Sequence, residues 1–158
     1  MHALVPAFLI GVVAGLRPMT AWAAVSWAAR LGWVRLENTP YAFMNSVTFP
    51  ELVSVAAISE LIADTLWRKA PAARAQRVLL ATLSSFAGAI CGAALGGARG
   101  GVTPGLLAGA LGAAAGAWGA YELRARMARA TGEKDFSIAL LENAMAVGGA
   151  FLIAARLR

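Results

Sequence analysis

The sequence contains little charge, a single cysteine and a single histidine. Charged residues make up 14% of its 158 positions, well below the ~25% of ordinary soluble domains. So few charges could not cover the surface of a soluble globule, and such high hydrophobicity excludes a disordered chain. The lone Cys91 excludes a disulfide scaffold or a cysteine-based zinc site, and the lone His2 excludes a histidine-rich metal cluster.

Apolar residues and glycine fill the chain instead. Hydrophobic residues account for 59%, and the 17 glycines bring the apolar share to about 70%, against ~45–50% in soluble domains. Five apolar runs approach the ~20 residues that a helix needs to cross a bilayer. They cover residues 3–27, 50–67, 78–97, 103–121 and 136–155. The sequence therefore predicts an all-α protein, a polytopic transmembrane helix bundle of about five spans, as a single integral membrane domain over residues 1–158 without a cofactor.

The distribution of basic residues predicts an orientation for these spans. The loops after the second and fourth runs carry eight of the 14 Lys and Arg residues, the opposite side carries five, and Arg17 lies within the first run. The positive-inside rule then places the amino terminus in the cytoplasm. The net charge of +6 predicts contact with anionic lipids at the cytoplasmic face of the lipid bilayer rather than with nucleic acid.

Small residues recur at helical spacing in the apolar runs. Gly88, Gly92 and Gly96 are four residues apart, as are Gly105 and Gly109. Such spacing lets helix backbones approach closely. The pattern indicates a compact helix bundle, and the alternative is a glycine-lined sliding surface in a transporter.

The first run is interrupted at Arg17-Pro18. Proline supplies no backbone N–H, and Gly15 loosens the preceding turn. A break at membrane depth is tolerated only where it is buried in protein or faces a wet cavity. We therefore predict that the first helix is broken at this point, and that it is tilted or re-entrant or that water bridges the gap between Arg17 and the acids of the other runs.

Four ionisable residues lie within the apolar runs: Arg17, Glu60, Asp64 and Glu142. Glu60 and Asp64 are four residues apart and share one helix face. The acids are expected to meet Arg17 inside the bundle, and two interpretations remain open. The cluster is a structural ion-pair network that fixes helix register, or it is a cation or proton site, with the identity of any metal unknown.

A weak internal similarity suggests an inverted repeat. Residues 27–32 resemble residues 127–132, and Glu60 in the second run has Glu142 as its counterpart in the fifth. Inverted repeats with a broken helix near the binding site are typical of transporters.

Several segments carry a family resemblance: Gly15-Leu16-Arg17-Pro18-Met19-Thr20, Glu60 with Asp64, the glycine-rich fourth run, and Leu141-Glu142-Asn143-Ala144. Over nearly its whole length the chain resembles the bacterial membrane family catalogued as domain of unknown function 4126. The family favours Glu-Asp where this chain has Glu142-Asn143. The resemblance implies a multi-pass protein of the bacterial inner (plasma) membrane, adds Asn143 to the candidate site, and implies no particular activity.

Three functions compete at this point. The first is a transporter- or channel-like protein for a cation, a proton-coupled solute or a lipid headgroup. It would be a homo-oligomer, because five spans are few to enclose a pathway. The alternative is a non-catalytic subunit or assembly factor of a larger membrane complex. A lipid-modifying enzyme ranks last, because the sequence has no His-Glu metal motif and no Ser-His or Cys-His pair; we expect no enzymatic activity.

Overall fold

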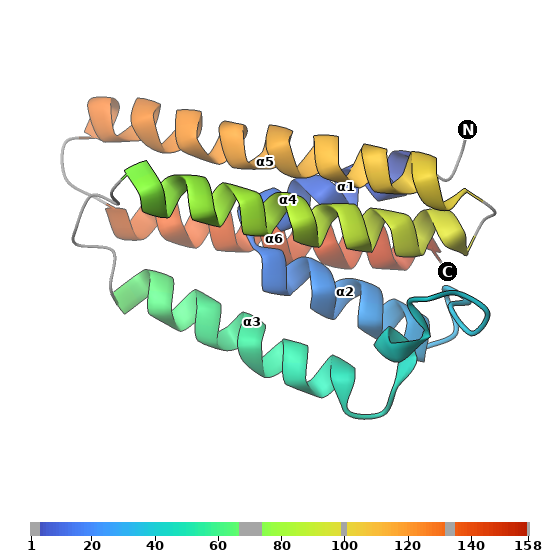
Figure 1. Cartoon of the computed structure of the whole chain (residues 1–158). Coiled ribbons are helices and arrows are strands. Elements are labelled where there is room, and N and C mark those ends of the chain that lie inside the picture. The colour runs from blue at the N-terminus through green and yellow to red at the C-terminus, as the bar shows by residue number, and fades with distance from the viewer. Residues whose placement is uncertain (1–3, 67–73, 99–100, 132–134, 158) are drawn as a thin grey trace.

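The computed structural model describes residues 4–66, 74–98, 101–131 and 135–157 (Figure 1). Within these ranges the chain forms six α-helices and one 3-10 helix, and no strand. The elements are α1 (Leu4–Leu16), α2 (Pro18–Arg30), η1 (Ala42–Asn45), α3 (Phe49–Leu66), α4 (Arg74–Gly97), α5 (Val102–Thr131) and α6 (Asp135–Leu157). The prediction of an all-helical bundle is confirmed.

The predicted break in the first helix is also confirmed. α1 ends at Leu16 and α2 begins at Pro18, with Arg17 between them in an extended conformation (φ −149°, ψ 95°). The residue before a proline is driven towards extended backbone, and proline suits the first position of a helix because it has no N–H to leave unpaired. The chain reverses here, so that α1 and α2 form a hairpin whose tip lies in the middle of the bundle (Figure 1).

The most closely packed part of the bundle is a three-helix unit of α1, α4 and α5, with α5 at the edge opposite α3 (Figure 1). Glycines on facing sides allow this approach. A Cβ added to Gly92 in α4 would lie 2.7 Å from the Cα of Gly109 in α5, and one added to Gly15 in α1 would lie 2.9 Å from the Cα of Gly116. Real Cβ atoms essentially never come so close to a neighbour. The glycine spacing therefore serves compact packing, with backbone against backbone.

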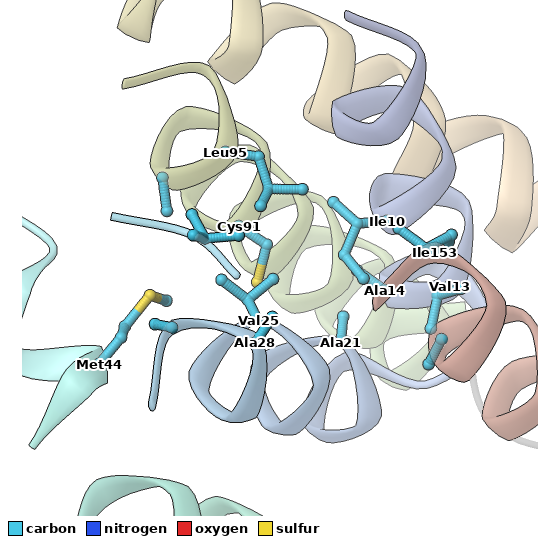
Figure 2. Close-up of a cluster of buried hydrophobic side chains, with 14 of the residues drawn as sticks. Ile10, Val13, Ala14, Ala21, Val25, Ala28, Met44, Cys91, Leu95 and Ile153 are labelled. Atoms are coloured by element: carbon cyan, nitrogen blue, oxygen red, sulfur yellow. The ribbon is translucent and has the colours of Figure 1, made fainter. Parts of the chain in front are cut away.

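α2 lies between this unit and α3, which is at the edge of the bundle (Figure 1). Small and medium-sized side chains fill the core between α1, α2, α4 and α6. Figure 2 shows Ile10, Val25, Cys91, Leu95 and Ile153 around it. Burial raises the pKa of the Cys91 thiol well above its ordinary value because the charged thiolate would be desolvated.

The membrane architecture predicted from composition is contradicted. Across the described ranges, no helix combines the length and the apolar character needed to cross a bilayer. The predictions of a polytopic transmembrane bundle of about five spans, and of a multi-pass protein of the bacterial inner membrane with a cytoplasmic amino terminus, are wrong by this finding.

The physical reasons lie in the helices themselves. α1 and α2 have 13 residues each, or about 20 Å at ~1.5 Å per residue, short of the ~30 Å of a hydrocarbon core. α3 carries three acids within 18 residues. Many of the apolar residues of α5 are alanine and glycine. Their small side chains bury little apolar surface, so they add little to the free energy of entering a bilayer.

The suggested inverted repeat has no support in the helix pattern. The first apolar run forms two helices, α1 and α2, whereas the fourth run, its counterpart in the suggested repeat, forms the single 30-residue helix α5.

Candidate functional site

Polar groups from three helices meet at the tip of the α1–α2 hairpin. We call this the hairpin junction and define it by Arg17, the backbone N–H of Met19, Glu60 of α3 and Asn143 of α6. Two of the residues singled out in the sequence, Arg17 and Glu60, are thus brought to one place with Asn143. The helix break creates the junction, since it frees backbone groups in the interior that side chains must satisfy.

Arg17 is the central residue of the junction. Only 4% of its surface is exposed, and its Nη2 donates a hydrogen bond of 2.5 Å to Oδ1 of Asn143. Its backbone N–H donates to the carbonyl of Val13 (2.7 Å), and its carbonyl accepts from Ala21 (3.3 Å). The backbone of Arg17 therefore makes the last hydrogen bond of α1 and the first of α2, while its side chain contacts α6.

The side chain of Glu60 caps the amino-terminal end of α2. Its Oε2 accepts a hydrogen bond of 3.2 Å from the N–H of Met19. Proline has no N–H, so this donor is among the first that α2 presents, and no side chain of the cap residue itself satisfies it. A carboxylate at a helix amino terminus is also favoured by the helix dipole.

The other predicted site residues take different places. Asp64 lies in α3 and Glu142 in α6, but their side chains fall outside the described part of the structure. Pro18 is the first residue of α2. Gly15 lies inside α1, where its missing side chain allows the contact with α5.

Sequence reasoning missed one participant, the Met19 N–H. It could have been found, since the residue after an initial proline must present a free donor. Outside the junction, the hydroxyls of Thr20 and Ser26 are buried in α2 and have no hydrogen-bond partner among the residues described, and the spacing of these residues does not predict this burial.

The junction combines one helix-end hydrogen bond with one side-chain pair. The Glu60 carboxylate accepts from the Met19 N–H at the start of α2, and the Asn143 amide oxygen accepts from the Arg17 guanidinium at the break. Among the described residues, no group of three or more His, Cys, Asp or Glu is placed to hold a metal ion. The arrangement fixes α2, α3 and α6 relative to one another.

A hollow of about 300 Å³ lies elsewhere, where the loop after α2 meets the end of α4. It is lined by Arg35, Glu37, Asn38, Thr39, Gly97 and Ala98. One basic residue, Arg35, and one acidic residue, Glu37, line it, and it shares no residue with the hairpin junction.

The outer faces of the helices form the second candidate site. On α5, Leu107, Leu111 and Trp118 are all exposed, Trp118 to 76%. Their spacing of four and seven residues places them on one side of the helix, and we call them the α5 stripe. Scattered surface apolar residues are ordinary, but a continuous row marks an interaction surface.

No protein-family model, curated protein or solved structure matches this chain. The resemblance to the domain of unknown function 4126 family therefore stays a prediction.

Proposed function

We propose that this protein is a non-catalytic subunit or assembly factor, which acts by binding another protein through the α5 stripe. The observation that carries the proposal is the row of large apolar side chains on the outer face of a helix whose inner face is fully packed. α5 already contacts α1 and α4 through its glycines. A further contact on its outer side must therefore come from another molecule.

The border of the α5 stripe favours a different protein as its partner. Glu122 and Arg126 follow the stripe on the same helix and form an ion pair of 2.8 Å. Charged residues beside an apolar row set partner choice and register. Both side chains are solvent-accessible, so they can rearrange to pair with a partner.

The hairpin junction has a supporting role in this proposal. Its hydrogen bonds hold α2, α3 and α6 in place, so that the outer faces are presented rigidly. Transport of a cation, a proton-coupled solute or a lipid headgroup stays a prediction that no finding tests.

The test is purification of the tagged full-length chain from its source cells under mild conditions. We expect one protein partner at a fixed ratio to the chain. The double substitution Leu111→Glu with Trp118→Glu should remove it, because burying two unpaired carboxylates in an apolar contact is costly.

The matched control is Leu111→Met with Trp118→Phe, which keeps the face apolar and should keep the partner. Far-UV circular dichroism checks that both double variants retain the helical fold. Recovery of the chain alone, as a clean homo-oligomer, or equal partner binding by both double variants, contradicts the proposal.

A further inference from the structure

We propose that the hollow between the loop after α2 and the end of α4 binds a small zwitterion, a molecule with one ammonium group and one carboxylate or phosphate. Figure 1 shows that this loop and the end of α4 lie at the same end of the bundle. The proposal goes beyond the proposed function, because the hollow shares no residue with the α5 stripe and needs no protein partner.

Two opposite charges line the hollow without pairing with each other. Arg35 and Glu37 both contribute to its wall. Within the described ranges, neither side chain makes an ion pair or a hydrogen bond. The two residues are neighbours but one in the chain, so their Cα atoms are at most about 7 Å apart. A ligand that carries both charges can therefore pair with both side chains, its ammonium with the carboxylate and its anion with the guanidinium.

The burial of the chain turns these two charges to the same side. Val34 and Leu36 are 6% and 0% exposed, whereas Arg35 and Glu37 are both exposed. Alternating burial is typical of an extended segment, in which successive side chains point to opposite sides. The two apolar residues hold the segment against the core, and the two charged residues are presented together at the hollow.

Hydrogen bonds fix the turn that follows the two charges. The N–H and the hydroxyl of Thr39 both donate to the carbonyl of Leu36, at 3.0 and 2.9 Å. The hydroxyl also accepts from the N–H of Tyr41 at 3.3 Å. Thr39 therefore shapes the hollow and leaves Arg35, Glu37 and the amide of Asn38 to bind a ligand. A backbone held in this way needs little ordering when a ligand binds.

Small residues at the end of α4 keep the hollow open. Gly97 and Ala98 line it, and a Cβ added to Gly97 would lie 3.7 Å from Cγ2 of Thr39 and 3.1 Å from Cγ2 of Val102. The end of α4 thus packs close to the loop. The carboxyl end of a helix carries partial negative charge, which favours the ammonium group of the ligand in addition to Glu37.

The size and the lining of the hollow exclude other classes of ligand. Its volume of about 300 Å³ is at the lower limit of ~300–1,000 Å³ for small-molecule sites, too small for a dinucleotide. The residues that line it include no large apolar side chain, so an apolar ligand would gain little. A simple anion would meet Glu37 and a simple cation would meet Arg35, and like charges disfavour both.

The experiment is titration of the purified full-length chain followed by ligand-observed saturation-transfer NMR. The probes are γ-aminobutyrate and phosphoethanolamine, and the controls are butyrate and butylamine, which carry one charge each. We expect at least one zwitterion to bind about tenfold more tightly than either control, because it gains a second charge-assisted contact. Binding of γ-aminobutyrate alone supports a carboxylate ligand, and binding of phosphoethanolamine alone supports a phosphate ligand.

Three variants assign the binding to the hollow. Arg35→Gln and Glu37→Gln each remove one charge and should weaken zwitterion binding about tenfold. Ala98→Phe fills the hollow without changing any charge and should weaken binding as much. The matched controls are Arg156→Gln and Glu51→Gln, which remove exposed charges that do not line the hollow; both should bind like the parent chain. Far-UV circular dichroism checks the fold, and the two charge variants change only exposed side chains.

Four results would overturn the inference: no binding of either zwitterion, equal affinity for butyrate or butylamine, unchanged binding by Arg35→Gln and Glu37→Gln, or an equal loss in the two control variants. The α5 stripe is intact in every one of these variants. Failure of the zwitterion site would therefore leave the proposed function standing, and loss of the α5 partner would leave the zwitterion site standing.

Discussion

Substitution of Gly109 by alanine tests the packing of the three-helix unit of α1, α4 and α5. Gly109 faces α4 and α1 at once. A Cβ at this position would lie against the Gly88 carbonyl oxygen and 2.9 Å from the Cα of Gly92. These neighbours are backbone atoms, which cannot rotate away as a flexible side chain can. The helices must therefore separate, and the loss extends along the shared interface.

The loss of stability expected for Gly109→Ala is best measured against a second Gly→Ala substitution in the same helix that meets no neighbour. Overpacking in a dense core costs about 1–3 kcal/mol, whereas Gly→Ala in a helix interior gains about 1 kcal/mol in helix propensity. Gly119 lies in the same helix, and nothing comes within 4 Å of its added Cβ. Gly119→Ala should therefore stabilise the protein. Gly109→Ala should be less stable than Gly119→Ala by about 1–3 kcal/mol, because the gain in helix propensity is common to both variants and only the overpacking cost differs.

The assay is denaturant unfolding followed by far-UV circular dichroism, with both variants and the parent chain under one set of conditions. Equal slopes would show that the midpoints report stability rather than a change in compactness. The packing argument is refuted if Gly109→Ala is as stable as Gly119→Ala.

Three further predictions concern buried polar groups. Asn143→Ala should destabilise the protein by about 1.5–3 kcal/mol in denaturant unfolding, because Arg17 loses a hydrogen bond at a charged donor; Asn143→Asp should restore it near neutral pH. Glu60→Ala should cost about 0.5–2 kcal/mol, as loss of a helix cap does, and Glu60→Gln should recover part because its amide oxygen still accepts from Met19. Cys91 should resist alkylation until the protein unfolds, and because burial raises its pKa, stability should fall above about pH 9, where only the unfolded thiol ionises.

Each of these predictions has a result that contradicts it. Unchanged stability of Asn143→Ala would show that the amide does not hold the guanidinium, and equal losses for Glu60→Ala and Glu60→Gln would show that hydrogen bonding at Met19 contributes nothing. Rapid labelling of the folded protein at Cys91 would contradict its burial.

Much of the helical architecture could be predicted from local signals. Pro18 after Arg17 dictates the break, and the predicted starts at residues 50 and 103 fall within one residue of α3 and α5. The glycine spacing correctly indicated close packing between helices. These features depend on backbone sterics, which the sequence states directly.

The membrane prediction was wrong because composition counts apolar residues and does not measure the apolar surface that each residue would bury in a bilayer. The first apolar run is long enough for one interrupted span, but the chain reverses at Arg17 and leaves two short helices. The candidate site was partly foreseen, since Arg17 and Glu60 do meet at one junction. The Met19 donor follows from the proline before it, but its acceptor on α3 and the buried hydroxyls of α2 depend on the tertiary arrangement, which no spacing rule encodes.

The most direct test of the account is photo-cross-linking from position 118 of α5 in source cells, with a photoreactive residue replacing the exposed Trp118. The account predicts a single protein adduct of discrete mass, larger than the chain by one partner. Adducts to lipid alone, or to two copies of this chain alone, would contradict the claim that the α5 stripe binds another protein.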